Sequence, residues 1–227
     1  HDPADDHWPA NFWSRAKEVL RDDRFALSAL DIAAHDLSSR IRVVPLFQAW
    51  GLSWENVPAS SYTIGIAPIQ QMVANLNERP DWSFYKIKLG TSNDLEIVQR
   101  LREHTEATLR VDENCGWTCE ETIVISAALS KLGVEFIEQP LPPDAPESDK
   151  EAVFAESVLP VIADEDCQIE SDVERCSRYF HGINVQLCKC GGLTPVLVML
   201  RRARDIGMQT MVGCMIESSV GISAAAH

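Results

Sequence analysis

Charged side chains recur along this sequence at nearly constant spacing, and their types could hold a metal ion and move protons. Successive members are 24 to 28 residues apart, and they are Lys88, Asp112, Glu138, Asp164, Lys189 and Glu217. The three consecutive acids supply carboxylate oxygens, which are the ligands that Mg²⁺ prefers. The lysines on either side could act as a base and its conjugate acid. We therefore predict one Mg²⁺ ion bound by Asp112, Glu138 and Asp164, with Lys88 and Lys189 as the proton-transfer residues.

A bound cation would resolve an electrostatic conflict among these acids. Three carboxylates packed together repel one another and raise one another's pKa values, whereas a divalent ion removes the repulsion. A free lysine has a pKa of about 10.4 and is a poor base at neutral pH, but Lys86 and bound Mg²⁺ would lower the pKa of Lys88. Because Lys86 and Lys88 flank Ile87 in one β-rich run, strand alternation directs both ammonium groups to the same side.

Short β-rich runs must position this series, because each member closes or directly follows one of them. The seven predicted strands are SYTIGI (61–66), FYKIKL (84–89), ATLRVD (107–112), VEFIE (134–138), LPVIAD (159–164), GINVQL (182–187) and QTMVGCM (209–215). Between them lie helical stretches with one apolar face, marked by Leu95, Val98 and Leu101, by Ile123, Ala127 and Ser130, and by Val196, Leu200 and Ala203.

Alternating strands and helices of about 25 residues per unit predict an α/β fold of the (β/α) TIM-barrel type. The carboxyl ends of such strands share one mouth, where the charged series would meet. An open doubly wound sheet is the competing architecture. The sequence contains neither GxGxxG nor GxxxxGK[ST], the phosphate-binding loops of many open sheets, so the barrel is favoured.

The N-terminal part reads differently, as helices without a preceding strand. SRAKEVL (14–20) and FALSALDIAAHDL (25–37) are helical, and Leu27, Leu30, Ala34 and Leu37 predict one buried face. We expect residues 1–58 to be the C-terminal helical part of a separate domain. Residues 59–227 would form the barrel, truncated before its eighth strand.

Composition excludes several classes of protein. A formal net charge of −14 disfavours a nucleic-acid surface, and no run of 18 apolar residues or signal peptide predicts a membrane segment. Seven cysteines without a disulfide or zinc-site pattern predict a reducing, cytoplasmic location. We expect no nucleic-acid or membrane partner, and we expect a homo-oligomer.

The motifs that carry the charged series resemble the enolase superfamily, in its muconate-lactonizing enzyme subgroup, and most closely the dipeptide (L-Ala-D/L-Glu) epimerases. The matches, in chain order, are SALDIAAHDL (28–37), YKIKLG (85–90), LRVDENCGW (109–117), EFIEQP (135–140), IADED (162–166), NVQLCKCGGLTP (184–195) and GCMIESSVGISAAAH (213–227). SALDIAAHDL is similar to the last helix of that family's capping domain, so the resemblance implies that residues 1–58 are the C-terminal helical part of an α+β capping domain. Two departures are Gln186, where many relatives carry Lys, and the absence of an eighth strand with a DxD motif.

The resemblance implies an isomerase, a racemase or epimerase that acts on amino acid derivatives by two-base 1,1-proton transfer α to a carboxylate. Its substrate would be a small carboxylate or a dipeptide such as L-Ala-D/L-Glu. Substrate contacts are implied for Thr63, Lys86, Cys214 and Ile216. Supporting positions around the metal and the bases are implied for Asn114, Glu165 and Glu217.

Two alternatives stay open at this point. The same superfamily contains o-succinylbenzoate synthases and cycloisomerase-type lyases, in which one lysine is the base and the other stabilises charge. A chain that lacks one barrel unit could instead be a catalytically silent domain that only binds or associates, because an open barrel exposes a sheet edge and apolar faces.

Overall fold

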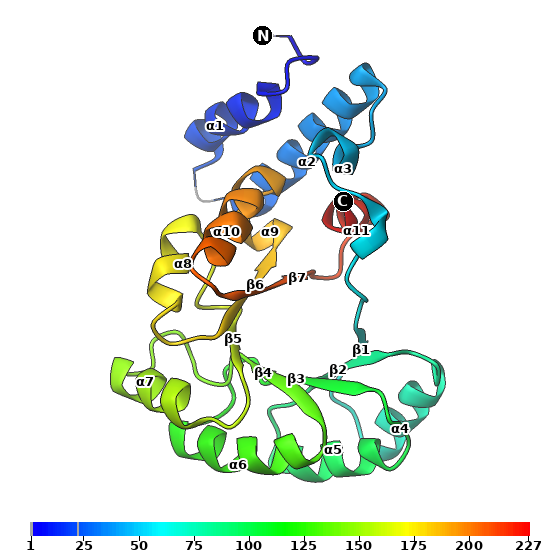
Figure 1. Cartoon of the computed structure of the whole chain (residues 1–227), viewed down its shortest axis with the longest axis vertical. Coiled ribbons are helices and arrows are strands. Elements are labelled where there is room, and N and C mark those ends of the chain that lie inside the picture. The colour runs from blue at the N-terminus through cyan, green and yellow to red at the C-terminus, as the bar shows by residue number, and fades with distance from the viewer. Residues whose placement is uncertain (1, 22) are drawn as a thin grey trace. The chain divides into compact units, whose positions relative to one another are not determined.

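The computed structural model describes residues 2–21 and 23–227, in which helices and parallel strands alternate from residue 62 onward (Figure 1). The strands are β1 (Tyr62–Ile64), β2 (Phe84–Lys88), β3 (Thr108–Asp112), β4 (Val134–Glu138), β5 (Val161–Ala163), β6 (Gly182–Gln186) and β7 (Gln209–Gly213). The helices are α1 (Trp8–Leu20), α2 (Arg24–Arg42), α3 (Leu46–Ala49), the 3-10 helix η1 (Trp54–Asn56), α4 (Ile69–Asn77), α5 (Asp94–Arg102), α6 (Cys119–Lys131), α7 (Glu147–Glu156), α8 (Glu170–Cys176), α9 (Leu187–Cys190), α10 (Leu193–Asp205) and α11 (Ser219–Ala226).

The order of strands in the sheet equals their order in the chain, from β1 to β7. Each pair from β1–β2 to β5–β6 is parallel, so each connection is a crossover that contains at least one helix. Consecutive parallel strands in chain order are typical of (β/α) barrels. All seven predicted strands are confirmed in the described part of the chain.

The described residues divide into two compact units. The first comprises residues 1–57, 167–173 and 184–227, and the second comprises residues 58–166 and 174–183. The first unit thus combines the N-terminal helices with the C-terminal segment of the chain. The predicted domain boundary between residues 58 and 59 stays a prediction.

The core of the second unit lies between its strands and helices α4 to α6, which lie along the sheet (Figure 1). Strand alternation on β2 buries Tyr85, Ile87 and the following Leu89 at 1% exposure or less, and leaves Lys86 and Lys88 on the opposite face. One face of this sheet is therefore apolar, whereas the other carries charge.

Helix α6 buries a different face from the predicted one. Thr122, Ser126 and Leu129 are fully buried, whereas the predicted Ile123, Ala127 and Ser130 are only half-buried. Thr122 and Ser126 are tolerated inside because their hydroxyls donate to backbone carbonyl groups of α6 and its N-cap, at 2.7 Å each. Because Thr122 and Ser126 are buried, the buried face of α6 lies one residue earlier in the sequence than its apolar residues indicate.

In the first unit, α2 packs against α1, α3, α9, α10 and α11. Leu27 and Ala34 are buried, which confirms this part of the predicted apolar face, but Leu30 and Leu37 are 42% and 44% exposed, so their predicted burial is wrong. Polar side chains take part of the buried face instead, among them Asp31, which accepts hydrogen bonds from Thr194. No helix of the described residues is both long enough and apolar enough to cross a membrane.

Candidate active site

The predicted acids of β3 and β4 meet the lysines of β2 in one buried ion cluster within the second unit. Lys86 Nζ lies 2.7 Å from Asp112 Oδ2 and 2.8 Å from Glu138 Oε1. Lys88 Nζ lies 2.6 Å from the same Asp112 oxygen. Parallel pairing produces this arrangement, because Lys88, Asp112 and Glu138 are successive partners in the register of β2, β3 and β4.

Burial and charge act in opposite directions on these groups. Burial favours the neutral form of Asp112, but the Lys86 and Lys88 ammonium groups hold its pKa below the usual range. Burial raises the pKa of Glu138 to about 7, with repulsion from Asp112 and Asp164 opposing the attraction of Lys86. For Lys86, burial lowers the pKa, but Glu138 and Asp112 raise it overall. The expected upward pKa shift of crowded carboxylates is therefore seen at Glu138, and not at Asp112.

Asn114 completes the surroundings of Asp112. Its side-chain Nδ2 donates to Asp112 Oδ1 at 2.7 Å, and its Oδ1 accepts from Lys88 Nζ at 3.3 Å. Asn114 has φ +47°, a left-handed conformation that Asn tolerates better than most residues. This turn directs both its backbone N–H and its amide back to the carboxylate.

Asp164, Glu165 and Thr63 lie in the same unit. Asp164 directly follows β5, is 5% exposed, and is close enough to Glu138 to raise its pKa. Glu165 and Asp164 both raise the pKa of the nearby Cys115 thiol, which burial raises first, to about 11. Thr63 is exposed on β1 and is the register partner of Lys86.

The donor chemistry of the three acids fits a hard divalent cation. Asp112, Glu138 and Asp164 are buried carboxylates at the ends of neighbouring strands, and the largely buried Lys86 ammonium already bridges two of them. Within residues 2–21 and 23–227, no three His, Cys, Asp or Glu side chains converge closely enough to form a metal-binding group. Lys86 Nζ lies between the Asp112 and Glu138 oxygens, so a cation bound there would require this side chain to turn aside.

The remaining predicted residues belong to the first unit. Lys189 is half-buried on the short helix α9, and its carbonyl oxygen accepts from Arg24 Nη1 at 3.4 Å. Glu217 interacts with the Cys188 thiol, and burial followed by the Glu217 charge raises the pKa of that thiol. Cys214 is exposed, and Ile216 is completely exposed.

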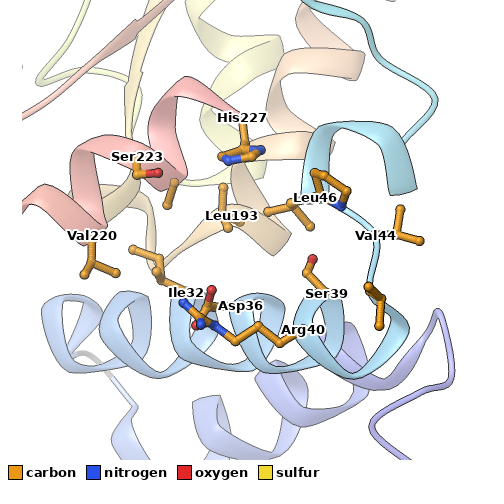
Figure 2. A pocket seen from close by; sticks show the side chains of 13 residues that line it. Ile32, Asp36, Ser39, Arg40, Val44, Leu46, Leu193, Val220, Ser223 and His227 are labelled. Carbon is orange, nitrogen blue, oxygen red and sulfur yellow. The ribbon is translucent and has the colours of Figure 1, made fainter.

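A groove of about 610 Å³ in the first unit is lined by α2, α3, α11 and the start of α10 (Figure 2). Its lining is mainly apolar, with Ile32, Leu46 and Leu193 labelled in the close view, and Arg40 forms an ion pair with Asp36 at 2.7 Å. None of the predicted site residues lines this groove.

Sequence reasoning missed the buried polar residues that surround the acids. Glu113 is 1% exposed, and burial followed by repulsion from Asp94 raises its pKa to about 10, so it is a neutral acid at neutral pH. Gln139 and Asp166 are also buried and hydrogen-bonded to each other. The available signal was that each of these polar residues lies within two positions of a predicted metal ligand.

Comparisons with known proteins identify the family of the chain and similar solved structures. The family described as "Enolase C-terminal domain-like" matches residues 69–227. An L-Ala-D/L-amino acid epimerase of Flavobacterium johnsoniae is 55% identical over 96% of this chain and 65% of that protein. One of the same name from Maribacter sp. is 54% identical over 89% of this chain and 60% of that protein. The chain thus spans less than two thirds of the length of these relatives.

Among solved structures, a dipeptide epimerase from Cytophaga hutchinsonii, complexed with Mg and the dipeptide D-Ala-L-Val, superimposes with a TM-score of 0.90. It is 26% identical in sequence, and the match covers 98% of this chain and 62% of that one. The predicted α/β fold and the resemblance to dipeptide epimerases are confirmed by these similarities. On the match over residues 69–227, the chain belongs to the enolase C-terminal domain-like family.

Proposed function

We propose that the protein is a Mg²⁺-dependent epimerase that inverts the carbon α to a carboxylate by two-base 1,1-proton transfer, on a dipeptide such as L-Ala-D/L-Glu. The observation that carries this proposal is the buried cluster in which Lys86 and Lys88 contact Asp112, and Lys86 also contacts Glu138. The similarity to proteins named as dipeptide epimerases supports the substrate class.

Asp112, Glu138 and Asp164 would hold the metal ion through carboxylate oxygens. When bound, Mg²⁺ supplies positive charge that stabilises the enediolate formed by loss of the α-proton. The Lys86 ammonium, turned aside from the oxygens that hold the metal ion, would contribute a second positive charge near the same acids. Asn114 holds Asp112 by an amide hydrogen bond, which keeps one carboxylate oxygen oriented while the other contacts the lysines.

Lys88 and Lys189 are assigned to the two proton transfers. Each must act once as a neutral amine that removes the α-proton and once as an ammonium that returns one, depending on the configuration of the substrate. Enolase-superfamily sites use a Lys or His base together with one or two Mg²⁺ ions that stabilise the enediolate. Asp112 and Asn114 contact Lys88 Nζ and would orient it toward the α-carbon.

Substrate contacts are assigned to Thr63, Lys86, Cys214 and Ile216. Thr63 is exposed beside Lys86 in the register of β1 and β2, so both can face one ligand. Cys214 and Ile216 are exposed after β7, where apolar contact with a substrate side chain is available. Glu165 and Glu217 are assigned as supporting residues around the bases.

Proton exchange with solvent deuterium tests the proposal. The protein is incubated with Mg²⁺ and L-Ala-L-Glu in deuterium oxide, and loss of the α-proton signal is followed by NMR together with formation of the epimer. Lys88→Ala and Lys189→Ala should each abolish epimerisation, and one of them should retain α-exchange with one stereoisomer. Lys131→Ala, at an exposed position that ends α6, is the matched control and should behave as wild type.

Full turnover in either active-site lysine variant would rule out the two-base scheme. No α-deuteration of any dipeptide in a library, with Mg²⁺ bound, would favour a lyase of the same superfamily. If the protein has no activity and its Kd for Mg²⁺ is no lower than millimolar, a catalytically silent binding domain would be favoured.

A further inference from the structure

We propose that Gln139 is a positioning residue that fixes the backbone of Asp164 to that of Glu138 and thereby sets the affinity for the divalent cation. The inference rests on the proposed function, because it takes these two acids as metal ligands. Gln139 directly follows Glu138 at the end of β4, is fully buried, and has φ +39°. It touches no reacting atom itself, and acts through its neighbours.

The Gln139 side chain uses both ends of its amide. Oε1 accepts from the backbone N–H groups of Asp164 at 2.9 Å and Asp166 at 3.2 Å. Nε2 donates to the carbonyl oxygen of Leu141 and to Asp166 Oδ2, both at 2.8 Å. Two donors and two acceptor sites are the full capacity of a carboxamide, so the residue is saturated.

The backbone of Gln139 joins the same elements. Its N–H donates to the carbonyl oxygen of Ile162 on β5 at 2.9 Å, and its own carbonyl oxygen accepts from Cys115 N at 2.8 Å. Gln139 therefore connects the loops that follow β3, β4 and β5. Each of these loops directly follows, or contains, one of the three candidate ligands.

Asp166 anchors this arrangement from the other side. It is 2% exposed, and its Oδ1 accepts from Lys150 Nζ at 2.8 Å and Arg175 Nη1 at 3.0 Å, while its backbone carbonyl oxygen accepts from Arg175 Nη2 at 2.7 Å. Lys150 is itself 5% exposed and donates to the carbonyl oxygen of Pro143 at 2.7 Å. A buried carboxylate with two cationic partners and an amide donor is fixed in place, so Gln139 bonds to a rigid acceptor.

Only glutamine satisfies this site among side chains of its size. Glutamate could accept from the two N–H groups, but it would place a second carboxylate against Asp166 Oδ2 and leave the Leu141 carbonyl without this donor. Methionine has similar length and volume but forms none of the four bonds, so two backbone N–H groups next to Asp164 would be left without their acceptor. The loop after β5 could then move relative to Glu138.

A small displacement matters for Mg²⁺, which requires near-ideal octahedral geometry. Loss of a residue that orients a metal ligand typically weakens metal binding by about 10- to 100-fold. We therefore expect Gln139→Met to raise the Kd for Mg²⁺ by about 10- to 100-fold. The amide protons of Asp164 and Asp166 should also exchange faster with solvent, whether or not metal is added.

The test measures Mg²⁺ binding by titration calorimetry and amide exchange by mass spectrometry in wild type and Gln139→Met. Ser126→Ala is the matched control, because Ser126 is fully buried in the same unit and bonds to Ile123 and Val158, away from the acids. Ser126→Ala should lower stability without changing the Kd. If Gln139→Met does not fold, Arg175→Met, whose side chain is 44% exposed, loosens Asp166 more mildly and should weaken Mg²⁺ binding in the same direction.

A Kd for Gln139→Met within twofold of wild type, or a loss of affinity equal to that of Ser126→Ala, would overturn the positioning role. Wild-type protein that binds Mg²⁺ but epimerises no dipeptide would contradict the proposed function alone, and the effect of Gln139 on binding would still stand. Wild-type protein that binds no Mg²⁺ would overturn both.

Discussion

Replacing Asp31 with Asn is expected to change how stability depends on pH. Asp31 is fully buried on α2, and its carboxylate accepts from the backbone N–H and the hydroxyl of Thr194, both at 2.8 Å. Burial raises its pKa from 3.8 to about 6, although the bonds from Thr194 oppose the rise. The folded protein holds this proton more tightly than the unfolded chain does. The stability contributed by Asp31 is therefore fully present below pH 3.8 and is lost as pH rises through about 6.

His35, one turn further along α2, titrates in the same range with the opposite sign. Burial lowers its pKa from 6.5 to about 4, so its contribution is present above pH 6.5 and is lost as pH falls through about 4. A tenfold change in proton affinity corresponds to about 1.4 kcal/mol. The contribution of each group to the free energy of unfolding therefore changes by about 3 kcal/mol between its two pKa values. As pH rises, the contribution of Asp31 to stability falls while that of His35 increases, so the two offset each other in the wild-type protein. Asp31→Asn removes one of them and should leave a stability that rises with pH.

Urea unfolding followed by circular dichroism between about pH 4 and pH 8 measures this difference. The free energy of unfolding of Asp31→Asn, relative to wild type, should increase by about 3 kcal/mol across that range. Asp36→Asn is the matched control, because Asp36 lies on the same helix with its side chain 52% exposed and pairs with Arg40 at 2.7 Å. That control should change stability by less than about 1 kcal/mol at any pH. Parallel pH profiles for Asp31→Asn and wild type would refute the reasoning.

Three further outcomes are expected. Thr118→Ala removes the capping box that begins α6 and should lower the free energy of unfolding by about 1 kcal/mol in urea titrations. Ile137→Ala leaves a cavity at a fully buried position of β4 and should cost about 2 to 5 kcal/mol, and a smaller loss would mean that the core collapses around it. Lys86→Met leaves Asp112 and Glu138 buried with one cation fewer, so Tm should fall without metal and rise more on addition of Mg²⁺ than in wild type, as differential scanning calorimetry would show.

The strands and the ion cluster could be predicted because both follow from patterns that repeat along the sequence. Alternation of apolar and charged residues identifies β2, and the equal lengths of the βα units place Lys88, Asp112 and Glu138 in one register. Parallel pairing then brings together residues that are 24 and 26 positions apart in the chain. Two periodicities, that of the strand and that of the unit, are sufficient for this part of the site.

The buried polar contacts could not be predicted in the same way. Gln139 bonds to Asp164 and Asp166, 25 and 27 positions away, through a single side chain that belongs to no repeating pattern. On α2, Asp31 is buried because its carboxylate accepts hydrogen bonds from Thr194. The buried face of the helix therefore differs from the face that its leucines indicate. Such contacts depend on tertiary structure, and hydrophobic spacing carries no signal for them.

The division of the chain into two units implies an order of folding during synthesis. The second unit is built mostly from the continuous range 58–166, and its strands pair with neighbours one βα unit away. The first unit depends on contacts such as that between Asp31 and Thr194, which lie 163 residues apart. Closing so long a loop is slow, and α2 cannot gain these contacts until α10 has left the ribosome. Helices α1 and α2, although made before the second unit, are therefore expected to complete their packing only after it, and until then to be exposed to chaperones and proteases on the nascent chain.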